Sequence, residues 1–301
     1  MKFAVKEIKH TKSGASCRIH EFGATVLSYT SAARREILFV SRDAKLDGSK
    51  AVRGGIPLVF PIFGPPKDES STMPQHGFAR NNVWSTVEGS EFDEDDSAGI
   101  SYELDFNKVT AGKGTNNSWE SGCYNVKLIL DISITGDALT TILNIHNTGE
   151  EAFPFEALFH TYYSIDDHSA MDGSKCFVQG LEGYNAYDQL TKRNKMIGSE
   201  PITIDSELDS IHTPPDGIYI ADLLIGVGAT ETIKLVCSGK VDGREVPVSV
   251  VVWNPHEKKA ASMGDFGSDQ YVDMLCVEPG LLRGDTLDAG KKATMKQIIA
   301  A

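Results

Sequence analysis

The sequence predicts an all-β protein, a large antiparallel β-sandwich with few short helices, and three observations support this fold class. Apolar and polar residues alternate with a period of two along much of the chain. Amphipathic helical runs are scarce. Gly- and Pro-rich turn signals recur at short spacing, which is typical of a sandwich or barrel. None of these turn segments is long enough to be a linker, so we expect a single domain over residues 1–301.

The clearest strand predictions begin near residue 100. Apolar residues occupy every second position over 100–106, which indicates a half-buried strand. The same alternation covers 124–134 and 139–145, and a Gly-Asp pair at 136–137 separates these two runs, so we expect a long antiparallel hairpin. The run Val246–Trp253 is nearly continuous in Val, which predicts a strand that is covered on both faces.

The charge of the chain restricts its partners. The formal net charge is −13, which argues against nucleic-acid binding, because phosphate backbones require clustered Lys and Arg. The same charge argues against binding to an anionic membrane surface. If the substrate is an anion, particular Arg or Lys side chains must hold it locally.

Cysteine usage and the N-terminus indicate the compartment. Residues 1–20 contain no unbroken apolar region, so we expect neither a signal peptide nor a membrane span, and we expect a cytoplasmic protein. A disulfide framework and a Cys-based zinc site are not expected, because the cysteines are odd in number and include no C-x-x-C pair. They are widely scattered: Cys17, Cys123, Cys176, Cys237 and Cys276.

Two Gly-containing segments carry polar residues suited to a ligand. In Arg53–Pro61, two glycines allow close approach of the backbone, and Arg53 can form a bidentate contact with an oxyanion. In Pro74–Arg80, Gln75 offers a donor and an acceptor, and Arg80 offers a planar cation. Each segment taken alone is equally compatible with a turn whose polar side chains are simply solvated.

His160 is a candidate general acid. It ends a run in which Phe153, Phe155, Ala157 and Phe159 should face one way, and Leu158 and His160 the other. Aromatic surroundings readily move the pKa of an imidazole around neutrality, which suits acid–base work. Considered alone, a single His is more often structural or solvent-facing.

Glu278 is the corresponding candidate base. Three apolar residues precede it in a predicted strand and Pro279-Gly280 follow, so we expect it where a sheet face ends. Partial burial there would raise the pKa of its carboxyl group toward that of a useful base. A solvated glutamate next to a turn is the alternative.

Several other chemistries lack their motifs. The chain contains no G-x-x-x-x-G-K-[ST], no G-x-G-x-x-G after a strand, no G-x-S-x-G and no H-E-x-x-H. A retaining glycosidase needs two carboxylates with opposite roles, and no second candidate stands out beside Glu278.

Taken together, these segments resemble the aldose 1-epimerase (galactose mutarotase-like) family, and more narrowly its hexose-6-phosphate mutarotase branch, the glucose-6-phosphate 1-epimerases. The neutral-sugar galactose mutarotases usually carry an Asn-His pair near the catalytic His, whereas Phe159-His160-Thr161 stands here, which favours the phosphosugar branch. The matching segments follow the family's order over most of the chain: Lys45–Lys50, Arg53–Pro61, Pro74–Arg80, Leu158–Tyr162, Tyr187–Leu190, Val252–Pro255 and Val277–Gly280.

The resemblance implies a large antiparallel β-sandwich with a sugar site on one concave face. It implies that His160 protonates the ring oxygen of a hexose 6-phosphate while Glu278 removes the proton of the anomeric hydroxyl. The acid and the base are expected on opposite sides of the sugar ring, and no metal or other cofactor is expected. Four further residues match the branch's substrate and phosphate contacts: Arg53, Gln75, Arg80 and, by weaker local similarity, Asp209.

Two other functions remain open at this stage. One is an aldose 1-epimerase that acts on neutral hexoses, and the other is a non-catalytic phosphosugar-binding or regulatory protein that uses the same fold. In each case we expect a small-molecule ligand, no nucleic acid, no membrane and a monomeric protein.

Overall fold

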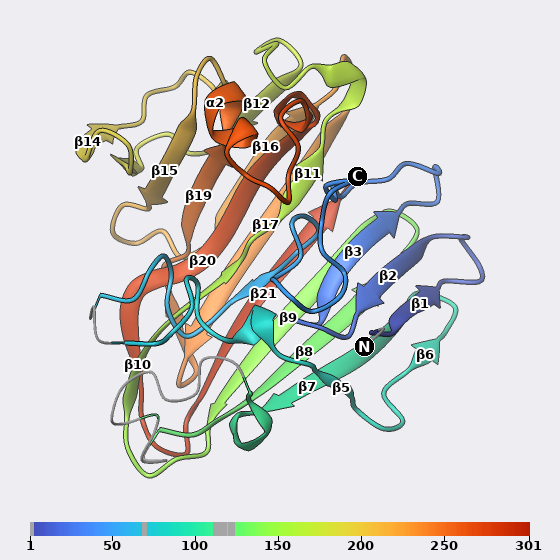
Figure 1. The fold of residues 1–301 in the computed structure, drawn as a ribbon, viewed down its shortest axis with the longest axis vertical. Coiled ribbons are helices and arrows are strands. Elements are labelled where there is room, and N and C mark those ends of the chain that lie inside the picture. The colour runs from blue at the N-terminus through green and yellow to red at the C-terminus, as the bar shows by residue number, and fades with distance from the viewer. Residues whose placement is uncertain (1–2, 68–70, 111–118, 120–123) are drawn as a thin grey trace.

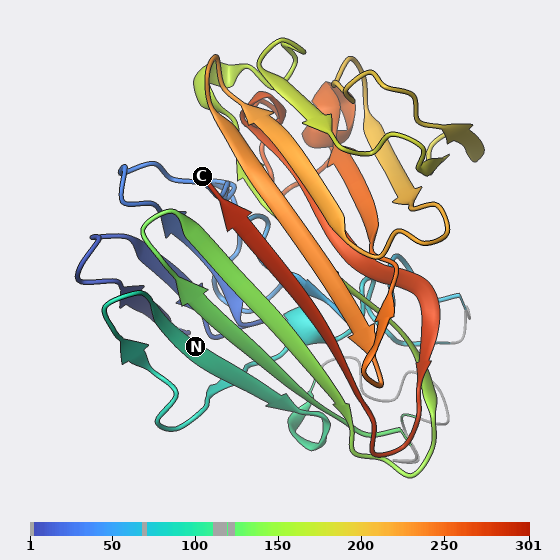
Figure 2. The same ribbon diagram turned by 180° about the vertical axis from the view of Figure 1, so that it is seen from behind.

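Two large antiparallel sheets and one smaller sheet build the fold, which confirms the predicted β-sandwich (Figures 1 and 2). The computed structural model describes residues 3–67, 71–110, 119 and 124–301. The smallest sheet has its strands in chain order: β1 (Val5–Lys9), β2 (Ser16–His20) and β3 (Thr25–Thr30).

The ten-stranded sheet contains the predicted hairpin. Its two strands are β8 (Val126–Ile134) and β9 (Ala138–Asn147), and the hydroxyl of Thr135 donates to Asp137 at 2.8 Å in the turn. Strand β7 (Ala98–Asp105), predicted at 100–106, pairs with β8. The other strands of this sheet are β5 (Ser85–Thr86), β6 (Phe92–Asp93), β12 (Cys176–Gln179), β16 (Ala221–Val227), β17 (Thr232–Val241), β18 (Arg244–Val246) and β21 (Lys292–Ala300). Their order is β12-β16-β17-β21-β9-β8-β7-β5, with β18 beside β17 and β6 beside β7.

The eight-stranded sheet includes part of Arg53–Pro61 and the strands next to His160 and around Glu278, whereas Pro74–Arg80 lies outside its strands. Its strands are β4 (Leu58–Val59), β10 (Phe153–Phe159), β11 (Tyr162–Ser164), β13 (Asn185–Asp188), β14 (Arg193–Met196), β15 (Leu208–Thr213), β19 (Ser249–Asn254) and β20 (Met274–Leu287). They are arranged in the order β14-β13-β15-β19-β20-β10-β4, and β11 also pairs with β20. Every pairing within this sheet is antiparallel.

The predicted strand over Val246–Trp253 is wrong at its start. Strand β19 begins at Ser249, and Val246 ends β18 in the other large sheet. Pro247 lies between them, and because it has no backbone N–H to donate to a ladder, it marks the point where the chain leaves one sheet for the other.

Helical structure is limited to short segments in the described part of the chain. The one α-helix with described bounds is α2 (His256–Ala261), and the 3-10 turns are η1 (Ala79–Asn81), η2 (Phe106–Lys108), η3 (Asp166–His168) and η4 (Gln270–Asp273). None of these described helices has the length and apolarity required to cross a membrane. Four cysteines are buried and free, whereas Cys123 lies outside the described residues.

The main hydrophobic core lies between the sheets. Alternating residues of β8 are buried, which gives the half-buried pattern that the sequence predicted. The same apolar cluster includes Leu143 of β9, Val252 of β19 and Tyr29 of β3, so all three sheets contribute to it. Phe155, Ala157 and Phe159 of β10 also belong to it, which leaves the opposite face of β10 free to support a site.

Replacing Phe153 by Ala is expected to lower the free energy of unfolding by about 3–5 kcal/mol, the usual cost of truncating a large buried aromatic side chain. Phe153 is fully buried in β10, and its ring lies 6.3 Å from that of Phe60. Urea denaturation measures the change. The matched truncation Met196→Ala, at a side chain that is 66% exposed in β14, should change stability by no more than about 0.5 kcal/mol. Equal effects of the two substitutions would contradict this account of the core.

Candidate active site

A cavity of about 440 Å³ opens on the face of the eight-stranded sheet that points away from the sandwich core. Alternation along β19 places it there, since Val250 and Val252 pack into the core whereas Val251 and Trp253 line the cavity. The volume is within the range of small-molecule sites. All six residues that the sequence marked as site candidates line this cavity: Arg53, Gln75, Arg80, His160, Asp209 and Glu278.

His160 lies directly after the end of β10. Its backbone N–H donates to the carbonyl oxygen of Pro57 at 3.0 Å, which holds the chain at this point. The imidazole stacks on the ring of Tyr162 with centroids 4.8 Å apart and meets the edge of Trp253 at 6.2 Å. With 7% of its surface exposed, the ring is held in one orientation at the cavity wall.

Glu278 lies inside β20, opposite Val251 of β19, and only 1% of its surface is exposed. The expectation that it would end a sheet face is wrong, because β20 continues through Pro279-Gly280 to Leu287. On one side, β20 pairs with β10 as far as Gly280 and with β11 from Cys276, and this ladder is interrupted between these two residues. A proline is tolerated in this interruption because its missing N–H leaves no ladder hydrogen bond broken.

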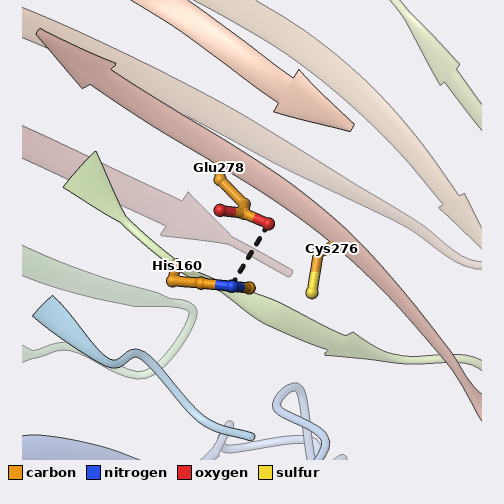
Figure 3. A group of neighbouring side chains, drawn as sticks. All are labelled: His160, Cys276 and Glu278. Carbon is orange, nitrogen blue, oxygen red and sulfur yellow. Dashed lines mark ion pairs between the residues drawn. The ribbon is translucent and has the colours of Figure 1, made fainter. Parts of the chain in front are cut away.

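The two proposed acid–base groups lie side by side (Figure 3). Nδ1 of His160 is 3.2 Å from Oε1 of Glu278, although the orientation is not that of a hydrogen bond. Among the described residues, neither His160 Nδ1 nor Glu278 Oε2 has a hydrogen-bond partner. The expectation that acid and base would lie on opposite sides of a sugar ring is therefore wrong, since no ring fits between atoms at this distance.

Burial raises the pKa of Glu278 and lowers the pKa of His160. Loss of solvent, with a smaller effect of the nearby Asp209 carboxylate, raises the pKa of Glu278 well above its ordinary value, and the charges of Arg80 and Arg53 oppose this increase. Loss of solvent also lowers the pKa of His160 well below its ordinary value. The carboxylate is thus a stronger base and the imidazolium a stronger acid than in water, and in the empty cavity burial disfavours both of these charged forms.

Arg53 is held by two neighbours at the cavity edge. Its Nη1 donates to the hydroxyl of Tyr162 at 3.2 Å, and its Nε lies 3.5 Å from Oδ1 of Asp265. The Asp265 side chain is almost fully buried, and it precedes η4 in a segment that no sequence motif marked. Because these contacts restrain the guanidinium, its orientation is set before any ligand arrives.

Arg80 and its neighbours form the adjoining wall. Nη2 of Arg80 donates to the backbone carbonyl of Gln75 at 3.0 Å, and burial lowers the pKa of Arg80 to about 10, so it stays cationic at neutral pH. His76, whose ring nitrogen is a further polar group of the Pro74–Arg80 segment, also lines the cavity. Its Nδ1 accepts from the N–H of Gly64 at 3.1 Å, and burial lowers its pKa to about 2, so a neutral ring carries its proton on Nε2.

Asp209 reaches the cavity from β15, where it pairs with Trp253 of β19. Its carboxylate accepts a hydrogen bond from the side chain of Gln189, which follows β13 and also lines the cavity. Burial raises the pKa of Asp209 above its ordinary value. Strands β13 and β15 pair with each other, and this pairing brings Gln189 and Asp209 together at the cavity. The sequence alone does not show that these two strands are neighbours.

The cavity is cationic although the protein is strongly acidic. Its lining includes the guanidinium groups of Arg53 and Arg80, the ammonium groups of Lys192 and Lys259, and two carboxylates. The chain as a whole has a formal net charge of −13. The two lysines were not predicted, because they lie after β13 and in α2 without any motif around them. A local excess of positive charge is what an anionic ligand requires.

Comparison with known sequences connects this chain to one family. The family model for aldose 1-epimerase matches residues 6–300. A protein of Cenchrus ciliaris, provisionally named a glucose-6-phosphate 1-epimerase, is 31% identical over 264 residues, which are 87% of this chain and 73% of that protein. An Escherichia coli K12 protein with the same provisional name is 27% identical over 257 residues, which are 85% of this chain and 76% of that protein.

Solved structures with the same fold agree with the sandwich described above. The crystal structure of a provisionally named mutarotase from Salmonella typhimurium aligns with a TM-score of 0.76 at 21% identity, and covers 100% of this chain and 92% of that chain. A galactose mutarotase related enzyme from Lactobacillus acidophilus aligns with a TM-score of 0.68 at 14% identity, over 99% of this chain and 97% of that chain. At these identities the likeness concerns the fold alone.

Proposed function

We propose, from the premise that the chain belongs to the aldose 1-epimerase family, that it interconverts the α and β anomers of hexose 6-phosphates. The observation that carries the substrate class is the pair of arginines in a cationic cavity of an acidic protein. Arg53 and Arg80 bind the phosphate dianion through charge-assisted hydrogen bonds, and Gln75 completes this end of the site. The provisional names of the relatives point to the same substrate class.

The reaction begins with two proton transfers, one at each of the two oxygens bonded to C1. Glu278 removes the proton of the hydroxyl on C1, and His160 delivers a proton to the ring oxygen O5, for which it must first take up a proton against the lowering of its pKa by burial. Both oxygens are bonded to C1, so two groups that lie 3.2 Å apart can serve them together. The C1–O5 bond breaks, its electron pair stays on O5, and the open chain carries an aldehyde at C1.

Reclosure then produces the other anomer. Rotation about C1–C2 presents the opposite face of the aldehyde to the hydroxyl on C5. His160, now neutral, removes the proton of that hydroxyl while Glu278, now protonated, returns a proton to the aldehyde oxygen. Both groups recover their starting protonation states, so nothing is consumed. Asp209 accepts hydrogen bonds from sugar hydroxyls and orients the ring during these steps.

The anomerisation rate of glucose 6-phosphate tests the proposal directly. Exchange NMR, with polarimetry as a second method, compares the rate with and without protein against glucose measured in the same way. We expect a clear acceleration with glucose 6-phosphate and a smaller one with glucose, because the free sugar lacks the group that the arginines bind. Spontaneous exchange is subtracted in each case.

Two other results would overturn the proposal in different ways. Equal acceleration of both sugars would indicate an aldose 1-epimerase without phosphate selectivity. Tight binding of glucose 6-phosphate without acceleration would indicate a phosphosugar-binding protein instead of an enzyme.

A further inference from the structure

A third side chain with metal-binding chemistry lies beside His160 and Glu278. Cys276 precedes Glu278 by two positions in β20, so both side chains project from the same face of the strand. The sulfur of Cys276, an imidazole nitrogen of His160 and a carboxylate oxygen of Glu278 all lie within 4.8 Å of one another. Figure 3 shows the three side chains converging from β20 and from the end of β10.

Two atoms in this cluster lack partners that buried polar atoms normally have. Nδ1 of His160 and Oε2 of Glu278 make no hydrogen bond with any described residue, although both side chains are more than nine-tenths buried. Such atoms are rare in folded proteins, and a bound water or ion is one explanation for them. Both residues line the cavity, so an ion can reach them from that side.

We propose that His160, Cys276 and Glu278 form an inhibitory site for a zinc ion. Imidazole, thiolate and carboxylate are the ligands that zinc prefers, and three protein ligands leave a fourth tetrahedral position for water or a ligand oxygen. Zinc–ligand distances of about 2.0–2.3 Å require the three groups to close only slightly around the ion. The sequence predicted no Cys-based zinc site, because only the fold brings His160, which follows β10, beside Cys276 and Glu278 of β20.

The charges in the cluster suit a divalent ion. The thiolate of Cys276 and the carboxylate of Glu278 together offset the two charges of zinc, although Arg53 and Arg80 are nearby. Magnesium and calcium prefer oxygen ligands, and this cluster offers one carboxylate, so these ions are not expected to compete. Zinc binds the thiolate form of cysteine, so binding must release the proton of the Cys276 thiol.

Inhibition follows if the proposed function is correct. Zinc occupies Nδ1 of His160 and the carboxylate of Glu278, and so removes both proton-transfer groups at once. Cys276 takes no part in the proposed reaction and does not line the cavity. Its loss should therefore weaken inhibition by zinc at least about 10–100-fold and leave anomerisation of glucose 6-phosphate near the wild-type rate. Binding of the metal, in contrast to inhibition, does not rest on the proposed function.

The test measures metal binding and activity separately on the full-length protein. Zinc affinity is measured by competition with a chromophoric chelator, and Co²⁺ is used as a spectroscopic probe, because a cobalt–thiolate bond gives a near-ultraviolet absorption band. Wild-type protein should bind one zinc ion, and with Co²⁺ in place of zinc it should show this band. Cys276→Ala should lose the band and bind zinc at least about 10–100-fold more weakly, since even changes outside the ligand shell have such effects.

Controls make the outcome specific. Cys176→Ala removes another buried cysteine, in β12 of the ten-stranded sheet, and should keep both the cobalt band and the inhibition by zinc. Cys276→Ser replaces Cys276→Ala if the smaller side chain destabilises the protein. Wild-type protein without a cobalt–thiolate band, or a Cys276→Ala variant that remains equally inhibited by zinc, would overturn the inference. If metal binds but the protein does not anomerise sugars, the proposed function fails and the metal site stands.

Discussion

Replacing Glu278 by Gln is expected to reduce kcat on hexose 6-phosphates by about 10²–10⁴-fold, the usual contribution of a positioned acid or base. The amide keeps the shape of the side chain, but it cannot accept the proton of the anomeric hydroxyl. Asp209 is the other carboxylate at this cavity, and it already accepts a hydrogen bond from Gln189. We therefore expect no replacement base and near-complete loss of the rate enhancement.

Binding and turnover must be measured separately to interpret this variant. Exchange NMR gives kcat for glucose 6-phosphate, and isothermal titration calorimetry gives its dissociation constant, which should stay close to the wild-type value. The matched control is Glu103→Gln in β7, whose carboxylate pairs with Lys127 at 2.7 Å in the other large sheet. If the Glu278→Gln variant binds the sugar and retains full turnover, another group is the base.

Replacing Arg80 by Ala is expected to raise KM for glucose 6-phosphate by roughly 10–100-fold, because charge-assisted hydrogen bonds contribute about 1.5–3 kcal/mol. KM for free glucose should change far less, since that sugar carries no phosphate. Arg80→Lys should recover part of the loss, because an ammonium keeps the charge but cannot form the bidentate contact. Steady-state anomerisation rates on both sugars provide the measurement.

The comparison between sugars separates recognition from local structure. Nη2 of Arg80 holds the carbonyl of Gln75, so the substitution also loosens the segment that carries Gln75 and His76. A purely structural effect would impair both substrates alike, and that outcome would remove Arg80 from phosphate binding. Arg18→Ala is the control, because it makes the same substitution at an exposed position of β2.

The strands of this protein could be predicted from the sequence because their signal is local. A half-buried strand requires an apolar residue at every second position, so the hairpin of β8 and β9 is legible without any knowledge of its partners. The prediction failed where a local pattern does not show which sheet a residue joins. Valines on both sides of Pro247 look like one strand, yet β18 and β19 belong to different sheets.

The residue types of the site were also legible, because motifs in family order connected His160, Glu278, Arg53 and Arg80 to one chemistry. Their arrangement was decided by the tertiary structure. Sheet order places the end of β10 against β20, and this pairing brings an imidazole within 3.2 Å of a carboxylate from a distant part of the chain. No sequence pattern specifies that distance or the full burial of Glu278, since both depend on which strands pair.

Three features of the site depend entirely on tertiary contacts. Asp265 supports Arg53, Lys259 adds positive charge to the cavity, and Cys276 joins His160 and Glu278 in a metal-binding arrangement. Each is an ordinary residue in its own segment. The sequence by itself determined the sandwich and the chemistry available to it, because alternation and motifs are properties of neighbouring residues. Packing of distant strands decided which groups share a pocket, how far solvent is excluded and hence how strongly their protons are held.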